Sequence, residues 1–438
     1  MTGYAKSQEA FPSNLHLWDP YPTNTAISET RVMEFFPSSS IESSDTITFT
    51  IPAMQDYMLE HVEVVSEIQV LRDGAPPPAD NDVGTSPHIA ASLWRNVNVT
   101  IGNSSLCQSF DNSYTMFKFW DQIIHDGQKT FSTLYRKEGM SLDHVKTKAA
   151  SEDVVYYPPN PEDLTPAPVA VNKNGHWRAE RIKEGRKVCL VSDLNVPIFK
   201  QSKLLPSDME IKVHLTKNYS EFILLCATNK TETVKFLQVS LRCTFQRPTE
   251  TVLNILEERL AQENAIYHAD KKILTFHSLT QGSNEITVDN VFNGELPYFF
   301  LYGVQDRASF GKARNKNPFT LHKMKYTNVY VNGQPHFPKR PEVAAHDDTF
   351  MYSAYIDQIG VKSGDTLLNE FYEAYPIMAC DLTQDRSQNR HGMNLSKNGA
   401  VSLTIGFPEE LPADRVLMVL AYYDQIIEIS KDRQVTFV

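Results

Sequence analysis

Apolar and polar residues alternate over many short stretches of this chain, and this alternation constrains the fold more than any other feature. In the stretch 61–70 the even-numbered positions Val62, Val64, Ile68 and Val70 are apolar, and most odd-numbered positions are His, Glu or Gln. Side chains of a strand point alternately to its two faces, so this period indicates strands with one buried face. Similar stretches lie at 97–101, 211–215, 239–245, 286–288, 329–331, 401–407 and 416–422.

Turn residues between these stretches favour a sandwich or jelly roll over an α/β fold. Asn332-Gly333 directly follows the stretch 329–331, and this dipeptide is a strong hairpin signal. Many short strands separated by Gly and Pro turns are typical of all-β proteins. The chain is therefore predicted to be all-β, with few short helices.

Two segments have helical spacing. In 250–264 the apolar residues Leu253, Leu256 and Leu260 recur every three or four positions, which predicts a connector helix near the middle of the chain. In 114–125 an aromatic stripe has the same spacing, and such a stripe is far more often core packing than a ligand site.

The two halves of the chain share a series of landmarks. Each has a strand with a Gly turn, then an aromatic segment, then an Asp-Gln-Ile tripeptide, and these lie at 97–102, 117–120 and 121–123, and at 329–333, 350–355 and 357–359. A further pair is Leu205-Pro206-Ser207-Asp208 and Leu411-Pro412-Ala413-Asp414, each followed by an alternating stretch. The common order predicts two copies of one β-sandwich.

A length of 438 residues suits two domains. We predict an N-terminal arm at 1–25, a first sandwich at 26–248, a helical connector at 249–264 and a second sandwich at 265–438. The arm is rich in Pro and aromatic residues, and it is either a frayed terminus or a segment that docks on a neighbouring subunit. Long loops are predicted at 151–185 and 335–348, where insertions between strands usually serve contacts.

Charge and composition exclude several classes of function. The net charge of -11 argues against packing onto a genome, and the basic clusters 178–187 and 312–316 are interpreted as solvated loops or contacts with an acidic partner. No apolar run is long enough for a transmembrane helix, and the N-terminus has no apolar signal region. The five cysteines Cys107, Cys189, Cys226, Cys243 and Cys380 are scattered, which suits free thiols.

No motif for catalysis or cofactor binding is present. The densest group of metal-ligand types is His346-Asp347-Asp348, which we interpret as a solvated loop. Glu257 and Glu258 are neighbours on the predicted helix and point apart, so they do not form an acid/base pair. We predict no catalytic, cofactor-binding or metal-binding residues, no cofactor and no enzyme activity.

Several segments together resemble one family of viral proteins. They are Asp56-Tyr57-Met58-Leu59 before the strand 62–70, Leu93-Trp94-Arg95-Asn96-Val97-Asn98-Val99, Phe292-Asn293-Gly294-Glu295-Leu296-Pro297, Val331-Asn332-Gly333-Gln334-Pro335, and the tail 422–429. In this order they are similar to hexon-like major capsid proteins of polintons, adintoviruses and adomaviruses. The resemblance covers roughly residues 45–438 and leaves out the loop 151–185.

The resemblance implies two tandem eight-stranded antiparallel jelly rolls. It further implies a homotrimeric, pseudo-hexagonal capsomer that tiles an icosahedral shell around a double-stranded DNA genome. The expected partners are neighbouring capsomers and penton and minor capsid proteins, without sequence-specific binding to nucleic acid. The expected location is the virion, after assembly in the host nucleus or cytoplasm.

Two other functions remain open from the sequence. The first is a virion spike or a receptor- or carbohydrate-binding jelly-roll protein. Such a protein needs an exposed aromatic or metal site at its loop tips, and only Trp177 lies in a loop expected to be exposed. The second is a hydrolase on a β-sandwich, which the absence of a catalytic motif disfavours.

Overall fold

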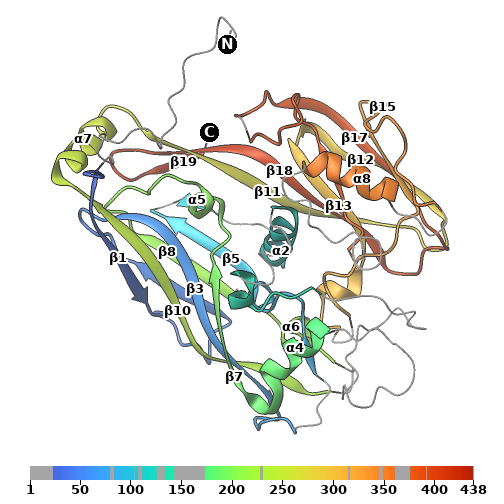
Figure 1. Ribbon diagram of the computed structural model, residues 1–438, viewed down its shortest axis with the longest axis horizontal. Helices are drawn as coiled ribbons and strands as arrows, with labels where there is room; N and C mark the ends of the chain where they lie inside the picture. Colours follow the sequence, from blue (N-terminus) through green and yellow to red (C-terminus); the bar gives the residue numbers. More distant parts are fainter. Residues whose placement is uncertain are drawn as a thin grey trace, which may run out of the picture.

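Two β-sandwiches stand side by side in the computed structural model (Figure 1). The structure describes residues 23–78, 83–102, 104–106, 111–125, 134–142, 173–226, 230–313, 316–344, 349–360, 375–390 and 392–437. Apart from residues 23–25, the predicted N-terminal arm lies outside these ranges.

The first sandwich pairs a sheet of order β1-β10-β3-β7 with a sheet of order β2-β8-β5-β6. The strands are β1 (Ile27–Phe35), β2 (Thr46–Ile51), β3 (Met58–Arg72), β5 (Trp94–Ile101), β6 (Ser104–Ser105), β7 (Lys187–Asp193), β8 (Ile211–Lys217) and β10 (Glu232–Pro248). A separate short ladder joins β4 (Gly84–Thr85) to β9 (Leu224–Leu225).

The second sandwich repeats this order with β11-β18-β13-β16 and β12-β17-β14-β15. Its strands are β11 (Ala265–Ser278), β12 (Glu285–Leu296), β13 (Phe299–Asp306), β14 (Tyr326–Val331), β15 (Gln334–Pro335), β16 (Met378–Asp381), β17 (Lys397–Gly406) and β18 (Arg415–Ile429), with β19 (Val435–Phe437) added beside β18. Counted along the chain, both sandwiches have the order first-eighth-third-sixth and second-seventh-fourth-fifth. The predicted fold of two antiparallel jelly rolls is confirmed.

The first series of shared landmarks occupies equivalent places. β5 and β14 are each the fourth strand of their sandwich, and each turns into a short fifth strand. Asn332 and Gly333 have φ values of 52° and 77°, the left-handed pair that this hairpin turn requires, and Gly102 has a φ of 56°. An aromatic helix follows in both copies.

The proposed equivalence of the two Leu-Pro segments is wrong. Residues 205–208 precede β8, the seventh strand of the first sandwich, whereas residues 411–414 precede β18, the eighth strand of the second. The segments share only a local turn, because Asp208 and Asp414 both adopt φ values near the left-handed region, 59° and 57°. Asp tolerates this conformation in any turn, so the similarity carries no information on topology.

The helices are α1 (Ile89–Ser92), α2 (Ser113–His125), α4 (Lys173–Ile182), α5 (Pro197–Lys200), α6 (Ser220–Ile223), α7 (Glu250–Leu260) and α8 (Thr349–Ile359), with short 3-10 turns η2 (Leu134–Glu138), η4 (Lys183–Gly185) and η5 (Arg307–Phe310). The two predicted helices are confirmed as α2 and α7, and α7 joins β10 to β11.

The predicted loop 151–185 is wrong at its end, where α4 and η4 lie. Gly175, Arg178 and Ile182 are buried at helical spacing, and Arg178 Nε donates to the carbonyl of Thr85 at 3.1 Å. A buried guanidinium breaks the apolar pattern by which a helix is usually recognised. Residues 143–172 lie outside the described part.

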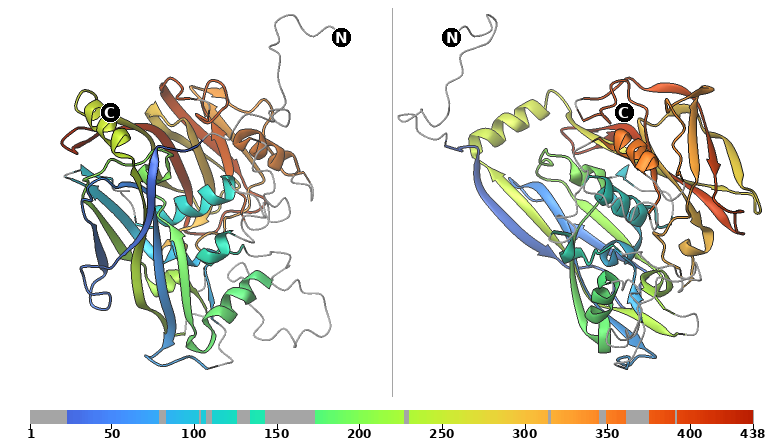
Figure 2. Two further views of the ribbon diagram at one scale, coloured as in Figure 1. Left: turned by 60° about the vertical axis from the view of Figure 1, so that its left-hand side comes forward. Right: turned by 45° about the vertical axis from the view of Figure 1, so that its right-hand side comes forward.

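Burial follows the predicted alternation in β3, where Val62, Val64, Ile68 and Val70 are all buried. By contrast, β13 and the stretch 416–422 of β18 are buried on both faces. One face lines the interior of the second sandwich and the other contacts α2, which lies between the sandwiches (Figure 2).

We expect Phe119→Ala to lower the free energy of unfolding by about 3–5 kcal/mol, because Phe119 of α2 is fully buried and stacks on Phe319 with ring centroids 3.9 Å apart. Urea denaturation measures the loss. The control Phe36→Ala removes a ring that is 59% exposed and should stay within about 0.5 kcal/mol of the wild type. Equal losses would contradict the packing of α2.

Candidate functional site

The junction at α2 holds the densest group of buried charged side chains in the described residues. Thr115, Lys118 and Gln122 recur at helical spacing and turn toward the first sandwich. Thr115 Oγ1 donates to the carbonyls of Ala91 and Trp94, both at 3.0 Å. The apolar residues of α2 face the other way and pack in one apolar cluster with the second sandwich, and they are Met116, Phe117, Phe119, Trp120, Ile123 and Ile124.

Glu138 lies at the centre of the polar side of this junction. Its Oε2 is 3.2 Å from Lys118 Nζ, 3.2 Å from His88 Nε2 and 3.0 Å from Gln122 Nε2, and all four side chains are buried. Burial raises the pKa of Glu138, but Lys118 and His88 outweigh it and hold the pKa down to about 2. Burial also lowers the pKa of His88, whose Nδ1 accepts from the amide of Ala91, so the ring is neutral.

Asp121 connects the two sandwiches directly. Its carboxylate accepts from Lys272 Nζ at 2.5 Å and from the Tyr422 hydroxyl at 2.6 Å, both in the second sandwich. Asn195 Nδ2 of the first sandwich donates to the same carboxylate at 3.2 Å. Lys272 also lies 5.7 Å from the ring centroid of Phe117. The arrangement neutralises a buried charge and fixes the angle between the sandwiches.

A second charged group lies on the outer face of the β1-β10-β3-β7 sheet. Ligand-type atoms of His61, Glu63 and Asp193 lie within 4.8 Å of one another. Lys137 Nζ already occupies the space between the acids, 2.8 Å from Glu63 and 3.2 Å from Asp193, and Arg242 also binds Glu63. The geometry therefore favours an ion-pair cluster over a metal site. The sequence did not reveal it, because Glu63 and Asp193 meet only through strand register.

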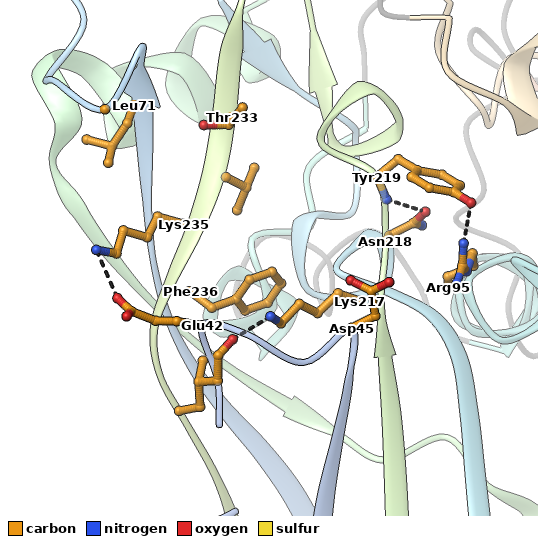
Figure 3. Close-up of a pocket in the computed structure, with 13 residues that line it drawn as sticks. Glu42, Asp45, Leu71, Arg95, Lys217, Asn218, Tyr219, Thr233, Lys235 and Phe236 are labelled. Atoms are coloured by element: carbon orange, nitrogen blue, oxygen red, sulfur yellow. Dashed lines mark hydrogen bonds and ion pairs between the residues drawn. The ribbon is translucent and has the colours of Figure 1, made fainter. Parts of the chain in front are cut away.

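A hollow of about 490 Å³ opens at one end of the first sandwich (Figure 3). Arg95 and Lys217 lie on its walls, and an ion pair of 3.1 Å between Lys235 and Glu42 lies at its rim. Lys217 Nζ donates to the carbonyl of Ile41, and burial lowers the pKa of this lysine. The hollow offers cations, carboxylates and hydroxyls, without a nucleophile and general base in contact.

The structure places most of the singled-out residues in packing roles. Trp177 is part of α4 and lies between the guanidinium groups of Arg136 and Arg181, 4.4 and 5.0 Å from its ring, so its prediction as an open loop aromatic is wrong. Glu257 pairs with Arg433 at 2.7 Å.

The basic cluster 312–316 is partly described. Lys312 lies 4.6 Å from the ring centroid of Tyr219, and Lys316 pairs with Asp306. His346-Asp347-Asp348 lies outside the described residues. Four of the cysteines are free thiols, and the fifth, Cys107, lies outside the described residues. None of the helices described is long and apolar enough to cross a membrane.

Comparison with known proteins finds related structures but no related sequence family. No family model matches the chain, and no curated protein matches it either. Solved structures do match over the whole length. A chain of the Sputnik virophage has 12% identity and a TM-score of 0.66, with 100% of this chain and 93% of that chain covered.

Two further matches are capsid proteins by description. The Faustovirus major capsid protein has 8% identity and a TM-score of 0.57, with 95% of this chain and 93% of that chain covered. The mavirus major capsid protein has 11% identity and a TM-score of 0.52, with 100% and 96% covered. The chain has the double jelly-roll fold of viral major capsid proteins. The resemblance noted in the sequence is confirmed at the level of the fold.

We expect Asp121→Ala to destabilise the protein by about 3–5 kcal/mol, because Lys272 is then left buried without its carboxylate. Thermal or urea denaturation measures the effect, and the double variant Asp121→Ala/Lys272→Met should recover part of it. Glu257→Ala removes an acid that is 47% exposed and should cost less than about 1 kcal/mol. Equal costs for the two acids would contradict the junction.

Low pH should lower the free energy of unfolding, because Glu138 becomes protonated. Its pKa in the folded state is about 2, below the ordinary 4.5, so its contribution is complete above about pH 4.5 and disappears as the pH falls toward 2. We expect Glu138→Gln to be less stable at neutral pH and to lose less stability between pH 4.5 and 2. Urea midpoints across this range measure both effects, with the exposed Glu409→Gln as control. An unchanged slope in Glu138→Gln would refute the assignment.

Proposed function

We propose that this chain is the major capsid protein of a double-stranded DNA virus or virus-like element. It forms homotrimeric, pseudo-hexagonal capsomers that tile an icosahedral shell. The observation that carries the proposal is the repetition of one complete jelly roll along the chain, matched over 95% of its length by the Faustovirus and over 100% by the mavirus major capsid protein. In this function the protomer acts through its shape and its contacts with other protomers, and no catalysis is assigned.

The proposed division is an arm at 1–25, a first sandwich at 26–248, a connector at 249–264 and a second sandwich at 265–438. The proposed partners are two further copies, neighbouring capsomers, and penton and minor capsid proteins, within the virion. An obligate interface of this kind buries roughly 2,000–5,000 Å2 and is apolar at its centre. Contacts between capsomers are individually weaker and gain strength by repetition.

Light scattering after size exclusion should give three times the protomer mass of 49.8 kDa. Electron microscopy of concentrated protein should show flat hexagonal capsomers or closed particles. A protein that stays at 49.8 kDa at every concentration, with no particles, would refute the capsid proposal.

The hollow at Arg95 and Lys217 favours a second candidate function, binding of an acidic sugar. Cations for a carboxylate and acids for hydroxyls line a space of about 490 Å³, within the usual range for small-ligand sites. It lies where β8 ends and β10 begins, at a loop-bearing end of the sandwich.

A sialylated trisaccharide should bind at least about tenfold more weakly to Lys217→Met than to the wild type, as expected for loss of a charge-assisted hydrogen bond. Titration calorimetry measures the difference. Lys271→Met is the control, since this lysine is exposed on β11 of the second sandwich and does not line the hollow. Equal binding by the asialo sugar would contradict recognition of the acid.

A further inference from the structure

The long helices α2 and α8 are equivalent parts of the two jelly rolls. Each follows the fifth strand and contains the same Asp-Gln-Ile tripeptide. His88 Nε2 donates to Gln122 Oε1 at 2.7 Å, and His336 Nε2 donates to Gln358 Oε1 at 2.9 Å. Both glutamines are buried against their own sandwich. The inner faces of the helices are therefore used in the same way.

The outer faces differ. Asp121 of α2 is 8% exposed and bonds to the second sandwich, whereas the matching Asp357 of α8 is exposed. Four residues earlier, Phe117 packs on Tyr422 with ring centroids 5.4 Å apart, whereas the matching Ser353 is exposed. Within the described ranges, no sheet covers the outer face of α8.

The sheets differ in the complementary way. The outer face of β11-β18-β13-β16 is covered by α2, and there Leu274, Leu420 and Tyr422 are buried. The equivalent sheet of the first sandwich is β1-β10-β3-β7, and its outer face remains open at Val32, which is 62% exposed, and at Arg242, which is 43% exposed. One chain thus contains one complete helix-on-sheet contact, in which α2 packs on β11-β18-β13-β16. It also contains the equivalent helix, α8, and the equivalent sheet, β1-β10-β3-β7, whose outer faces are both exposed.

The chemistry of the open pair is polar. Arg242 and Thr244 of β10 lie on the outer face with Val32 and Glu34 of β1 as their cross-strand neighbours. A surface that is in water before assembly needs such groups, whereas the face under α2 is buried as the chain folds and is apolar. Arg242 is 43% exposed but already pairs with Glu63 through Nε and Nη2, so Asp357 would add a second carboxylate to the same guanidinium. The two surfaces are therefore complementary in architecture, and both are polar.

We propose that α8 of one protomer packs on the outer face of β1-β10-β3 of the next protomer, with Asp357 directed at Arg242. This contact repeats between chains the one that α2 makes within a chain, and it rests on the proposed capsomer. In Figure 1, α8 and β1 lie toward opposite ends of the long axis, so the contact is head to tail. A head-to-tail contact closes into a ring when its rotation allows, and three copies supply six sandwiches in alternation.

Exposed positions on both surfaces test the contact without disturbing the cores. Ser353→Arg and Asp357→Lys change α8, and Val32→Lys changes the sheet. We expect each to weaken association of the protomers by tenfold or more in sedimentation velocity. The control Leu395→Lys changes a residue that is 78% exposed in the loop before β17, and it should associate like the wild type.

Cross-linking between different copies provides a direct readout. In a background with Cys107 and Cys189 replaced by Ser, one protein carries Asp357→Cys and a second carries Thr244→Cys. Oxidation of the mixture should yield a disulfide-linked dimer that neither protein alone yields in quantity. As the matched control, each of these two proteins is mixed and oxidised with a third protein that carries Glu409→Cys. Glu409 is exposed and lies on neither surface, so this mixture should give little disulfide-linked dimer.

The outcomes separate this inference from the proposed function. If the wild type is a trimer, and the three surface variants remain trimeric with no mixed disulfide, the capsomer stands and the α8 contact is refuted. If the wild type never exceeds the protomer mass, the capsomer itself is refuted. Loss of the trimer in both sets of variants, together with the mixed disulfide, supports the contact.

Discussion

The structure depends on the packing of α2 between the two jelly rolls. This helix buries both of its faces, since its polar stripe bonds to the first sandwich and its aromatic stripe packs on the outer face of the second. Asp121 bonds to groups on both sides at once. Without α2 the apolar outer face of β11-β18-β13-β16 would be exposed, and patches of that kind drive aggregation.

Charged groups at this junction determine geometry. Glu138 and Lys118 are buried as an ion pair. The Glu138 carboxylate also bonds to His88, Gln122 and the amide of Asp193, and the Lys118 ammonium bonds to the carbonyl of Asp193. A satisfied buried network of this kind selects one arrangement of the surrounding elements, and breaking it is costly. The same residue types could support chemistry in a solvent-open cleft, but here they are enclosed by the two sandwiches.

The two sandwiches share one topology and differ in their outer surfaces. Both copies keep the same strand order, the same hairpin after the fourth strand and the same buried glutamine in the following helix. Where the first copy places Phe117 and a buried Asp121, the second places Ser353 and an exposed Asp357. The outer face that is covered within the chain is apolar, and the outer face that is open in the protomer is polar.

The sequence by itself determined the β-class, the two copies, the hairpin at Asn332-Gly333 and the existence of α2 and α7, because strand alternation, turn chemistry and helical spacing are local properties. It failed at α4, where a buried arginine breaks the apolar period, and at the Leu-Pro segments, where a local turn was mistaken for topology. Only the tertiary structure decided that the polar stripe of α2 is buried and that Glu63 meets Asp193. Amphipathic period shows that a helix has two faces, but the partner that covers each face depends on contacts between residues far apart in the chain.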